Sequence, residues 1–358
     1  MKKISLFCLF CIVFSACVFQ KNTEIKLKIE NQENKIKELE NITADLKKNH
    51  ELQLEDQIQK IEKLEQFIFL INTQIEKGII VKLIPPFIPQ EVEFCGEKVP
   101  LTKFQVRERL ERALLQEMNR LGMYLVFLRS GRWFPMIEKE IQNQELPDDL
   151  KYLAVIESDL NVEAYSYAGA VGLWQFITST AKNLCGLTIN SYIDERLDPE
   201  KSTNAALKHL KELYQEFGDW MSALVGYNMR KDRYKKERIK ERALGFYDVK
   251  DIPNETSQYP FRAIAVKLIM ENPEKYGFPD WEKINKVKYS PYPVQPVIVT
   301  ISKNRERIVD IAEYYKMSYY EFRVFNPHLL IKKNRYKEVV RDYLPLGKYR
   351  IYIKKDSE

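Results

Sequence analysis

The sequence predicts a mainly α-helical protein, with a long helical stalk before a helical domain and a small β-α-α-β module after it. Three observations support this prediction. Aliphatic residues recur at near-heptad spacing through residues 23–76, with no glycine or proline before Gly78. Residues 84–290 contain helical patterns with capping residues at their ends. After Pro296, segments that alternate as strands do enclose two helical segments.

The first 17 residues, MKKISLFCLFCIVFSAC, combine two lysines with a short apolar run at residues 4–14. This run is too short to span a bilayer permanently, so it predicts a secretion signal. The final FSAC resembles a relaxed bacterial lipobox, with Phe14 where leucine is usual. This resemblance implies removal of residues 1–16 and lipidation of Cys17. An ordinary signal peptide followed by an incidental cysteine is the alternative.

Because the chain is expected to be exported, its predicted partners are those found outside the cytoplasm. We expect a chain that is lipid-anchored to a membrane and faces the periplasm of a bacterial cell envelope. The formal net charge of +6 favours contact with acidic polymers or membrane surfaces. Nucleic acid is not an expected partner, because the chain is directed out of the cytoplasm.

Residues 17–83 are predicted to form the stalk, as a long helix or coiled coil that could mediate self-association. The aliphatic residues are Ile25, Ile29, Ile36, Leu39 and Leu46 before a slip near His50, then Leu54, Ile58, Ile61, Ile68 and Ile75. A straight helix of this segment would be roughly 80 Å long. A solvated, partly disordered charged spacer is the alternative.

The helical domain begins after the IPPFIPQ break at residues 84–90. Pro147 is expected to open a helix that carries Glu157. A second helix is expected to begin at Asp198, with Pro199 in its first turn, and to end at Gly218.

No metal ion or cofactor is predicted. The acidic residues Asp194, Glu195 and Asp198 have no fourth ligand in view, so capping and turn formation explain them better than a cation site. The three histidines, His50, His209 and His328, are scattered along the chain. Spacing alone leaves open whether Cys95 and Cys185 are paired or free.

Glu157 is the candidate catalytic group. On a continuous helix it shares a face with apolar residues, namely Leu150, Leu153, Ala154 and Leu160. An apolar environment disfavours the charged carboxylate and raises its pKa. A carboxyl group that is still protonated near neutral pH can protonate a leaving oxygen. A buried glutamate that only caps a turn is an equally good interpretation of the periodicity.

The segment AYSYAGAVGLWQF that follows contains small residues, which allow a bulky ligand to approach the backbone. Gln175 offers an amide donor and acceptor, the type of group that can bind an acetamido side chain. Trp174 and Phe176 could stack on sugar rings, but they are equally expected in a hydrophobic core.

Taken together, Glu157-Ser158, Ser166, GAVGLWQF, the Tyr227-Asn228 pair and IPNETSQYPFRAIA at residues 252–265 resemble the lytic transglycosylase (SLT) domain of the lysozyme superfamily. The upstream segment RSGRWFPMIEKEIQNQELPDDLKYLAVIES resembles the membrane-bound lytic murein transglycosylase D group. The resemblance implies a lysozyme-like catalytic domain, with a helical N-terminal extension, over residues 84–290. It also implies a peptidoglycan glycan strand as substrate.

The resemblance implies a role for each matching residue. Glu157 matches the sole catalytic acid/base, and Ser166 and Gln175 match groups that line the glycan subsites. Ile177 takes the place of a methionine that lies against the sugar. Tyr227, with Asn228 beside it, matches a tyrosine near the catalytic carboxyl group, and Tyr259 matches a tyrosine that closes the cleft. Core packing is the alternative for Ile177 and for Tyr259.

The sequence departs from the family pattern at three places, the mildest of which is Val162 where the family usually has proline after Asn161. The usual A-Y-N-A-G reads GYNMR at residues 226–230 and is followed by a basic stretch. Residues 291–358 resemble a LysM module, but SKNRE at residues 302–306 replaces the usual Gly-Asp-Thr turn. This degenerate module is expected to bind sugar or to act as a structural cap.

Two other functions remain open. A hydrolytic muramidase would need a second carboxylate, for which Asp159, Glu163 and the distant Glu255 are candidates. Asp159 would point away from Glu157 on a continuous helix. A non-catalytic envelope tether would explain the anchor, the stalk and the LysM-like tail.

Overall fold

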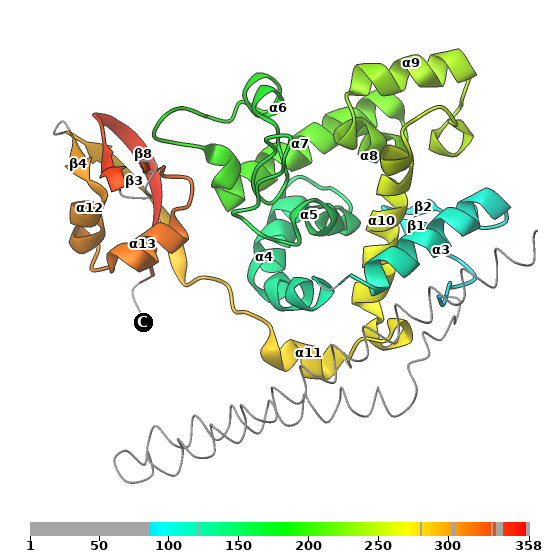
Figure 1. Cartoon of the computed structure of the whole chain (residues 1–358), viewed down its shortest axis with the longest axis horizontal. Helices are drawn as coiled ribbons and strands as arrows, with labels where there is room; N and C mark the ends of the chain where they lie inside the picture. The colour runs from blue at the N-terminus through cyan, green and yellow to red at the C-terminus, as the bar shows by residue number, and fades with distance from the viewer. Residues whose placement is uncertain are drawn as a thin grey trace, which may run out of the picture. The chain divides into compact units, whose positions relative to one another are not determined.

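The computed structural model describes residues 86–120, 122–279, 281–302, 305–330, 332–333 and 339–355. The predicted signal, Cys17 and the stalk lie outside these residues. The described residues belong to one compact unit, Pro85–Glu358. Its mainly helical character, visible in Figure 1, confirms that part of the predicted fold. Within the described ranges, no helix combines the length and the apolar character needed to cross a membrane.

The helical domain begins with a small antiparallel hairpin of β1 and β2. Its elements are β1 (Glu93–Phe94), β2 (Glu97–Lys98), α3 (Phe104–Met118), α4 (Met123–Asn143), α5 (Lys151–Ser158), α6 (Thr178–Asn183), α7 (Pro199–Phe217), α8 (Trp220–Asn228), α9 (Lys231–Glu241), α10 (Asn254–Glu271) and α11 (Trp281–Val287). Short 3-10 turns at Asp148–Leu150, Glu195–Leu197, Phe246–Asp248 and Pro273–Tyr276 connect several of them.

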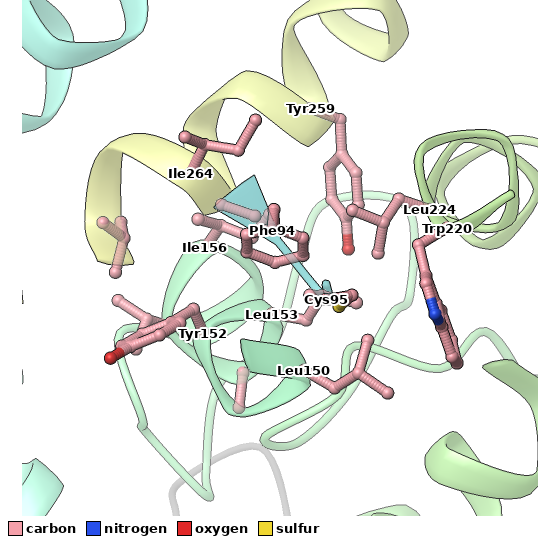
Figure 2. Packing of buried hydrophobic residues seen from close by; sticks show 14 of the residues in the cluster. Phe94, Cys95, Leu150, Tyr152, Leu153, Ile156, Trp220, Leu224, Tyr259 and Ile264 are labelled. Atoms are coloured by element: carbon pink, nitrogen blue, oxygen red, sulfur yellow. The ribbon is translucent and has the colours of Figure 1, made fainter. Parts of the chain in front are cut away.

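Helix α10 is the central element of the domain because it is buried on most of its surface. It packs against α3, α5 and α8, and most of its side chains are buried. Figure 2 shows Tyr259 of α10 in the same cluster as Phe94 of the hairpin, Ile156 of α5 and Leu224 of α8. The core therefore joins segments that are far apart in the sequence.

Helix α7 begins and ends where its sequence predicts. The Asp198 side chain accepts hydrogen bonds from the backbone amides of Glu200 and Lys201, and Pro199 occupies the first turn. Gly218 ends the helix in the left-handed conformation, with φ of 80°. Asp194 likewise caps the Glu195–Leu197 turn, which confirms the capping interpretation of these acidic residues.

The C-terminal module contains the predicted strand, two helices and closing strand, with shorter strands added. These elements are β3 (Val294–Ile301), β4 (Glu306–Arg307), α12 (Ile308–Tyr314), α13 (Tyr319–Phe325), β5 (Lys332–Lys333), β6 (Val339–Arg341), β7 (Tyr343–Leu344) and β8 (Gly347–Lys354). Strands β3 and β8 pair antiparallel along their full length. A capping box between Ser318 and Glu321 starts α13.

The C-terminal module is hydrogen-bonded to the start of α7. The Tyr352 hydroxyl donates to Asp198 Oδ1 over 2.7 Å, and the Asp194 amide donates to the His328 carbonyl over 2.9 Å. Arg350 forms an ion pair with Glu200. The two hydrogen bonds join buried residues and the ion pair is partly exposed, so the module is an integral part of the unit.

Candidate active site

Glu157 lies in the last turn of α5, and the helix ends one residue later. Asp159 and Leu160 both adopt the left-handed conformation, with φ of 54° and 56°. The prediction that the helix continues to Leu160 is therefore wrong, although Leu160 is still fully buried. The Ser158 hydroxyl donates to the carbonyls of Ala154, over 3.1 Å, and Leu173, over 2.9 Å. These bonds fix the end of α5 against the segment that contains GLWQF.

The Glu157 carboxyl group is held by a tyrosine from another helix. The Tyr259 hydroxyl donates a hydrogen bond to Glu157 Oε1 over 2.6 Å. Glu157 remains partly exposed, so a ligand can reach it, whereas Tyr259 is buried in the core. A short bond from a buried donor fixes the orientation of the carboxyl group.

The environment raises the pKa of Glu157 to about 7, mainly because burial disfavours its charged form. The hydrogen bond from Tyr259 and the charge of Arg262 oppose this rise, and the charge of Glu255 adds to it. The expected elevation of the Glu157 pKa is thus confirmed. A carboxyl group with a pKa near neutrality can both donate and accept a proton.

Tyr227 connects α8 to the segment after Glu157. Its hydroxyl donates to the Trp174 carbonyl over 2.8 Å, and its ring lies 5.9 Å from that of Phe176. Burial and the nearby charge of Glu157 raise the pKa of Tyr227 well above its ordinary value. Tyr227 therefore stays protonated as a donor that positions the loop.

Residues 164–177 form a loop that a buried arginine holds in place. The Arg196 guanidinium donates to the carbonyls of Gly169, over 2.9 Å, and Phe176, over 3.0 Å, and it pairs with Asp194. At Gly172, φ is +84°, and a Cβ atom would lie 2.1 Å from the Arg196 carbonyl oxygen. The chain thus needs a glycine at this position for both conformation and space.

The other predicted site residues lie on this loop or close to it. Ser166 is exposed, and its Oγ accepts a hydrogen bond from the Ala170 amide over 2.9 Å. The Gln175 amide nitrogen donates to the carbonyls of Gly172, over 2.9 Å, and Ala164, over 3.2 Å, so it is already engaged with the loop. Ile177 is 41% exposed, and Asn228 is half-buried at the end of α8.

The three candidates for a second carboxylate differ in position. Asp159 is bound by Arg120, and the Arg129 guanidinium donates to its carbonyl over 2.9 Å, so it stabilises the end of α5. Glu163 is exposed. Glu255 is exposed, lies one turn before Tyr259 on α10, and is close enough for its charge to affect Glu157. Of these three carboxylates, Glu255 is the one whose charge contributes to the raised pKa of Glu157.

Sequence reasoning missed a charged cluster behind Glu157. Glu117 of α3 is fully buried, and its Oε1 accepts a hydrogen bond from Arg262 Nε of α10 over 2.7 Å. Its Oε2 lies 2.8 Å from Arg120 Nε, and Arg120 also pairs with Asp159. No local pattern predicts this cluster, because its members come from three distant segments.

The donor groups for a metal ion are not gathered anywhere in the described part of the chain. No three histidine, cysteine, aspartate or glutamate side chains there are placed to hold an ion. Cys95 and Cys185, whose pairing the sequence left open, are free thiols.

Comparison with known proteins identifies the domain that carries Glu157. Residues 134–249 match the family model of the transglycosylase SLT domain. The sequence is 32% identical over 178 residues to membrane-bound lytic murein transglycosylase D of Escherichia coli K12, covering 48% of this chain and 38% of the relative. It is 34% identical over 113 residues to peptidoglycan transglycosylase gp16 of Escherichia phage T7, covering 31% of this chain and 8% of the relative.

Among solved structures, the chain is similar to the 70 kDa soluble lytic transglycosylase SLT70 from Escherichia coli. The TM-score is 0.33 with 22% identity, over 40% of this chain and 24% of the other. The match of residues 134–249 to the family model confirms the similarity to the transglycosylase SLT domain that the motifs predicted. Over that part of its length, the chain is homologous to membrane-bound lytic murein transglycosylase D, and the match spans less than two fifths of that relative.

Proposed function

We propose that this protein is a peptidoglycan lytic transglycosylase, a lyase that cleaves the β-1,4 bond between N-acetylmuramic acid and N-acetylglucosamine without water. Glu157 is the acid and base of this reaction. The observation that carries the proposal is a Glu157 carboxyl group with a pKa of about 7, oriented by Tyr259 and still accessible from solvent. The SLT domain match and the murein transglycosylase relatives support the same substrate class.

The reaction has two proton transfers through one carboxyl group. Protonated Glu157 first gives its proton to the glycosidic oxygen, and the bond from that oxygen to muramyl C1 breaks. The substrate's own 2-acetamido group stabilises the cationic centre. Ionised Glu157 then removes the proton of the muramyl 6-hydroxyl, whose oxygen bonds to C1. The product is a 1,6-anhydromuramyl end, and Glu157 is protonated again.

The residues around Glu157 have separate roles in this proposal. Tyr259 orients the carboxyl group, and Tyr227 holds the loop through the Trp174 carbonyl. Ser166, Ile177 and Asn228 line the glycan subsites. The Gln175 amide nitrogen is engaged with the loop, so its carbonyl oxygen is the group left to accept a hydrogen bond from the sugar.

The cellular setting is also part of the proposal. We infer a role in cell-wall remodelling for a protein that faces the periplasm and is anchored through a lipid on Cys17. Membrane-bound relatives support this location. Self-association through the stalk and sugar binding by the LysM-like module remain predictions.

Glu157→Gln tests the catalytic assignment. The amide keeps the size of the side chain and can accept the Tyr259 hydrogen bond, but it has no proton to transfer. Release of muropeptides from purified peptidoglycan should fall by a factor on the order of 10²–10⁴. A folded variant that retains most of the activity contradicts the assignment. A parent protein that binds peptidoglycan without cleaving it supports the alternative function of a non-catalytic envelope tether.

Hydrolysis is the second candidate reaction, because Glu255 is near enough to influence Glu157. Digestion of peptidoglycan in heavy-oxygen water separates the two reactions. The transglycosylase gives anhydro ends that are lighter by one water and carry no label. Labelled reducing ends that disappear in Glu255→Gln would identify a muramidase that uses Glu255 to activate water.

A further inference from the structure

The charged cluster of Glu117, Arg120, Arg262 and Asp159 centres on the fully buried Glu117 and includes Arg262, whose charge acts on Glu157. Arg262 is one turn after Tyr259 on α10, so it is on the same side of the helix as the hydroxyl that contacts Glu157. Glu117 is fully buried on α3 and binds the Arg262 guanidinium. A buried carboxylate is costly unless it is paired, so this pair fixes Arg262 firmly.

We propose that Arg262, oriented by Glu117, is a positioning residue that stabilises the ionised form of Glu157 between the two proton transfers. The proposal rests on the proposed function of Glu157 and adds a reason for the charged cluster. The positive charge of Arg262 favours the Glu157 carboxylate that remains after the leaving oxygen is protonated. The buried Glu117 keeps the guanidinium at a fixed place, so no reorganisation is needed during the reaction.

The groups that act on Glu157 come from two helices. Helix α10 contributes Tyr259, Arg262 and Glu255, and α8 contributes Tyr227. Arg262 is the positive member of this set. Together with the Tyr259 hydrogen bond, its charge opposes the rise in pKa that burial and the negative charge of Glu255 cause.

Arg120 provides a matched control on the same buried carboxylate. Arg120 follows α3 in the sequence, and its Nε lies 2.8 Å from Glu117 Oε2. Its guanidinium also binds Asp159. Removing either arginine therefore takes one partner from Glu117. Only the removal of Arg262 takes away the positive charge that acts on Glu157.

The test is the pH dependence of glycan cleavage by the full chain. Cleavage needs protonated Glu157, so activity falls on the basic side as pH rises through the Glu157 pKa. Arg262→Met should raise that pKa and move the basic limb of the kcat profile upward by roughly half a pH unit or more. Arg262→Lys, which keeps the charge, should leave the limb close to that of the parent. Arg120→Met should lower the melting temperature without moving the limb.

A second variant allows for the instability that one unpaired buried charge causes. The double variant Glu117→Met/Arg262→Met replaces the buried pair by apolar side chains of similar length, a change that proteins often tolerate. It should move the basic limb in the same direction as Arg262→Met. An unmoved limb in this folded, active double variant overturns the proposal. An equal movement in Arg120→Met also overturns it, because the effect would then be general disruption.

A titration without substrate separates this proposal from the proposed function. The infrared difference between the parent and Glu157→Gln reports ionisation of the Glu157 carboxyl group alone. The same difference in the Arg262→Met background should have its midpoint at higher pH. If the midpoint moves but no anhydro product forms, the proposed function fails and the effect of Arg262 on the ionisation of Glu157 stands. If product forms and the midpoint does not move, the role of Arg262 fails.

Discussion

Glu157 should destabilise the folded protein above neutral pH, and Glu157→Gln should remove that penalty. The ordinary pKa of a glutamate is 4.5, and the folded environment raises that of Glu157 to about 7. The folded protein therefore binds more protons than the unfolded chain between these two values. Its stability falls as pH rises through this window, because the unfolded carboxyl group ionises without the cost of burial.

The size of the effect follows from the two pKa values. A difference of about 2.5 between them corresponds to about 3 kcal/mol at 1.36 kcal/mol for each pKa unit. Glu157 keeps some contact with solvent, so this value is an upper limit, and we expect about 2–3 kcal/mol. Glutamine has no charged form and retains an oxygen that can accept from Tyr259. The variant should thus match the parent near pH 4 and exceed its stability by this amount at pH 8.

Urea denaturation followed by tryptophan fluorescence, repeated from pH 4 to pH 8, measures this difference. All other titrating groups are common to the two proteins and largely cancel. Glu163→Gln is the control, because Glu163 is exposed and its replacement should change stability by less than about 0.5 kcal/mol at every pH. A stability difference for Glu157→Gln that does not depend on pH, or a more stable parent at pH 8, would refute the reasoning.

Three other substitutions test separate parts of the structure. Gly172→Ala places a Cβ 2.1 Å from the Arg196 carbonyl oxygen, whereas no atom lies within 4 Å of a Cβ at Gly169. Denaturation should show a loss well above the roughly 1 kcal/mol strain expected for Gly169→Ala, and equal losses would contradict the crowding argument. Tyr352→Phe removes the buried bond to Asp198 and should cost about 1.5–3 kcal/mol, against about 0.5–1.5 kcal/mol for Tyr349→Phe, which loses a bond to the Pro345 carbonyl. Cys17→Ser should release the protein from membranes in detergent partitioning, and a variant that stays with the membrane contradicts the lipobox prediction.

The sequence predicted features that depend on neighbours along the chain. The start and end of α7 follow from Asp198, Pro199 and Gly218, which act within one or two turns. Helix α13 is one of the two helical segments predicted after Pro296, and a capping box starts it. The raised pKa of Glu157 was predicted from apolar residues on its own helix, and burial is its main cause in the structure.

The features that sequence reasoning missed depend on distant residues or on unusual backbone conformations. Helix α5 ends at Asp159 and Leu160 in the left-handed conformation, without the glycine that usually indicates such an end. Arg120 binds the Asp159 side chain and Arg129 its carbonyl, so tertiary contacts stabilise that end. Glu117 has the spacing of a helix residue, and its main partner besides the nearby Arg120 is Arg262, 145 positions away in the sequence.

The value of about 7 for the Glu157 pKa results from opposing influences, and this balance suits a group that must transfer a proton twice. Burial and Glu255 alone would favour the protonated form, which could donate a proton but could not readily remove one from the muramyl hydroxyl. Tyr259 and Arg262 alone would favour the carboxylate, which has no proton to donate. A pKa close to the working pH keeps both forms accessible at low cost. The contacts of α10 with α5 and with α3 are therefore as important to the proposed chemistry as the glutamate itself.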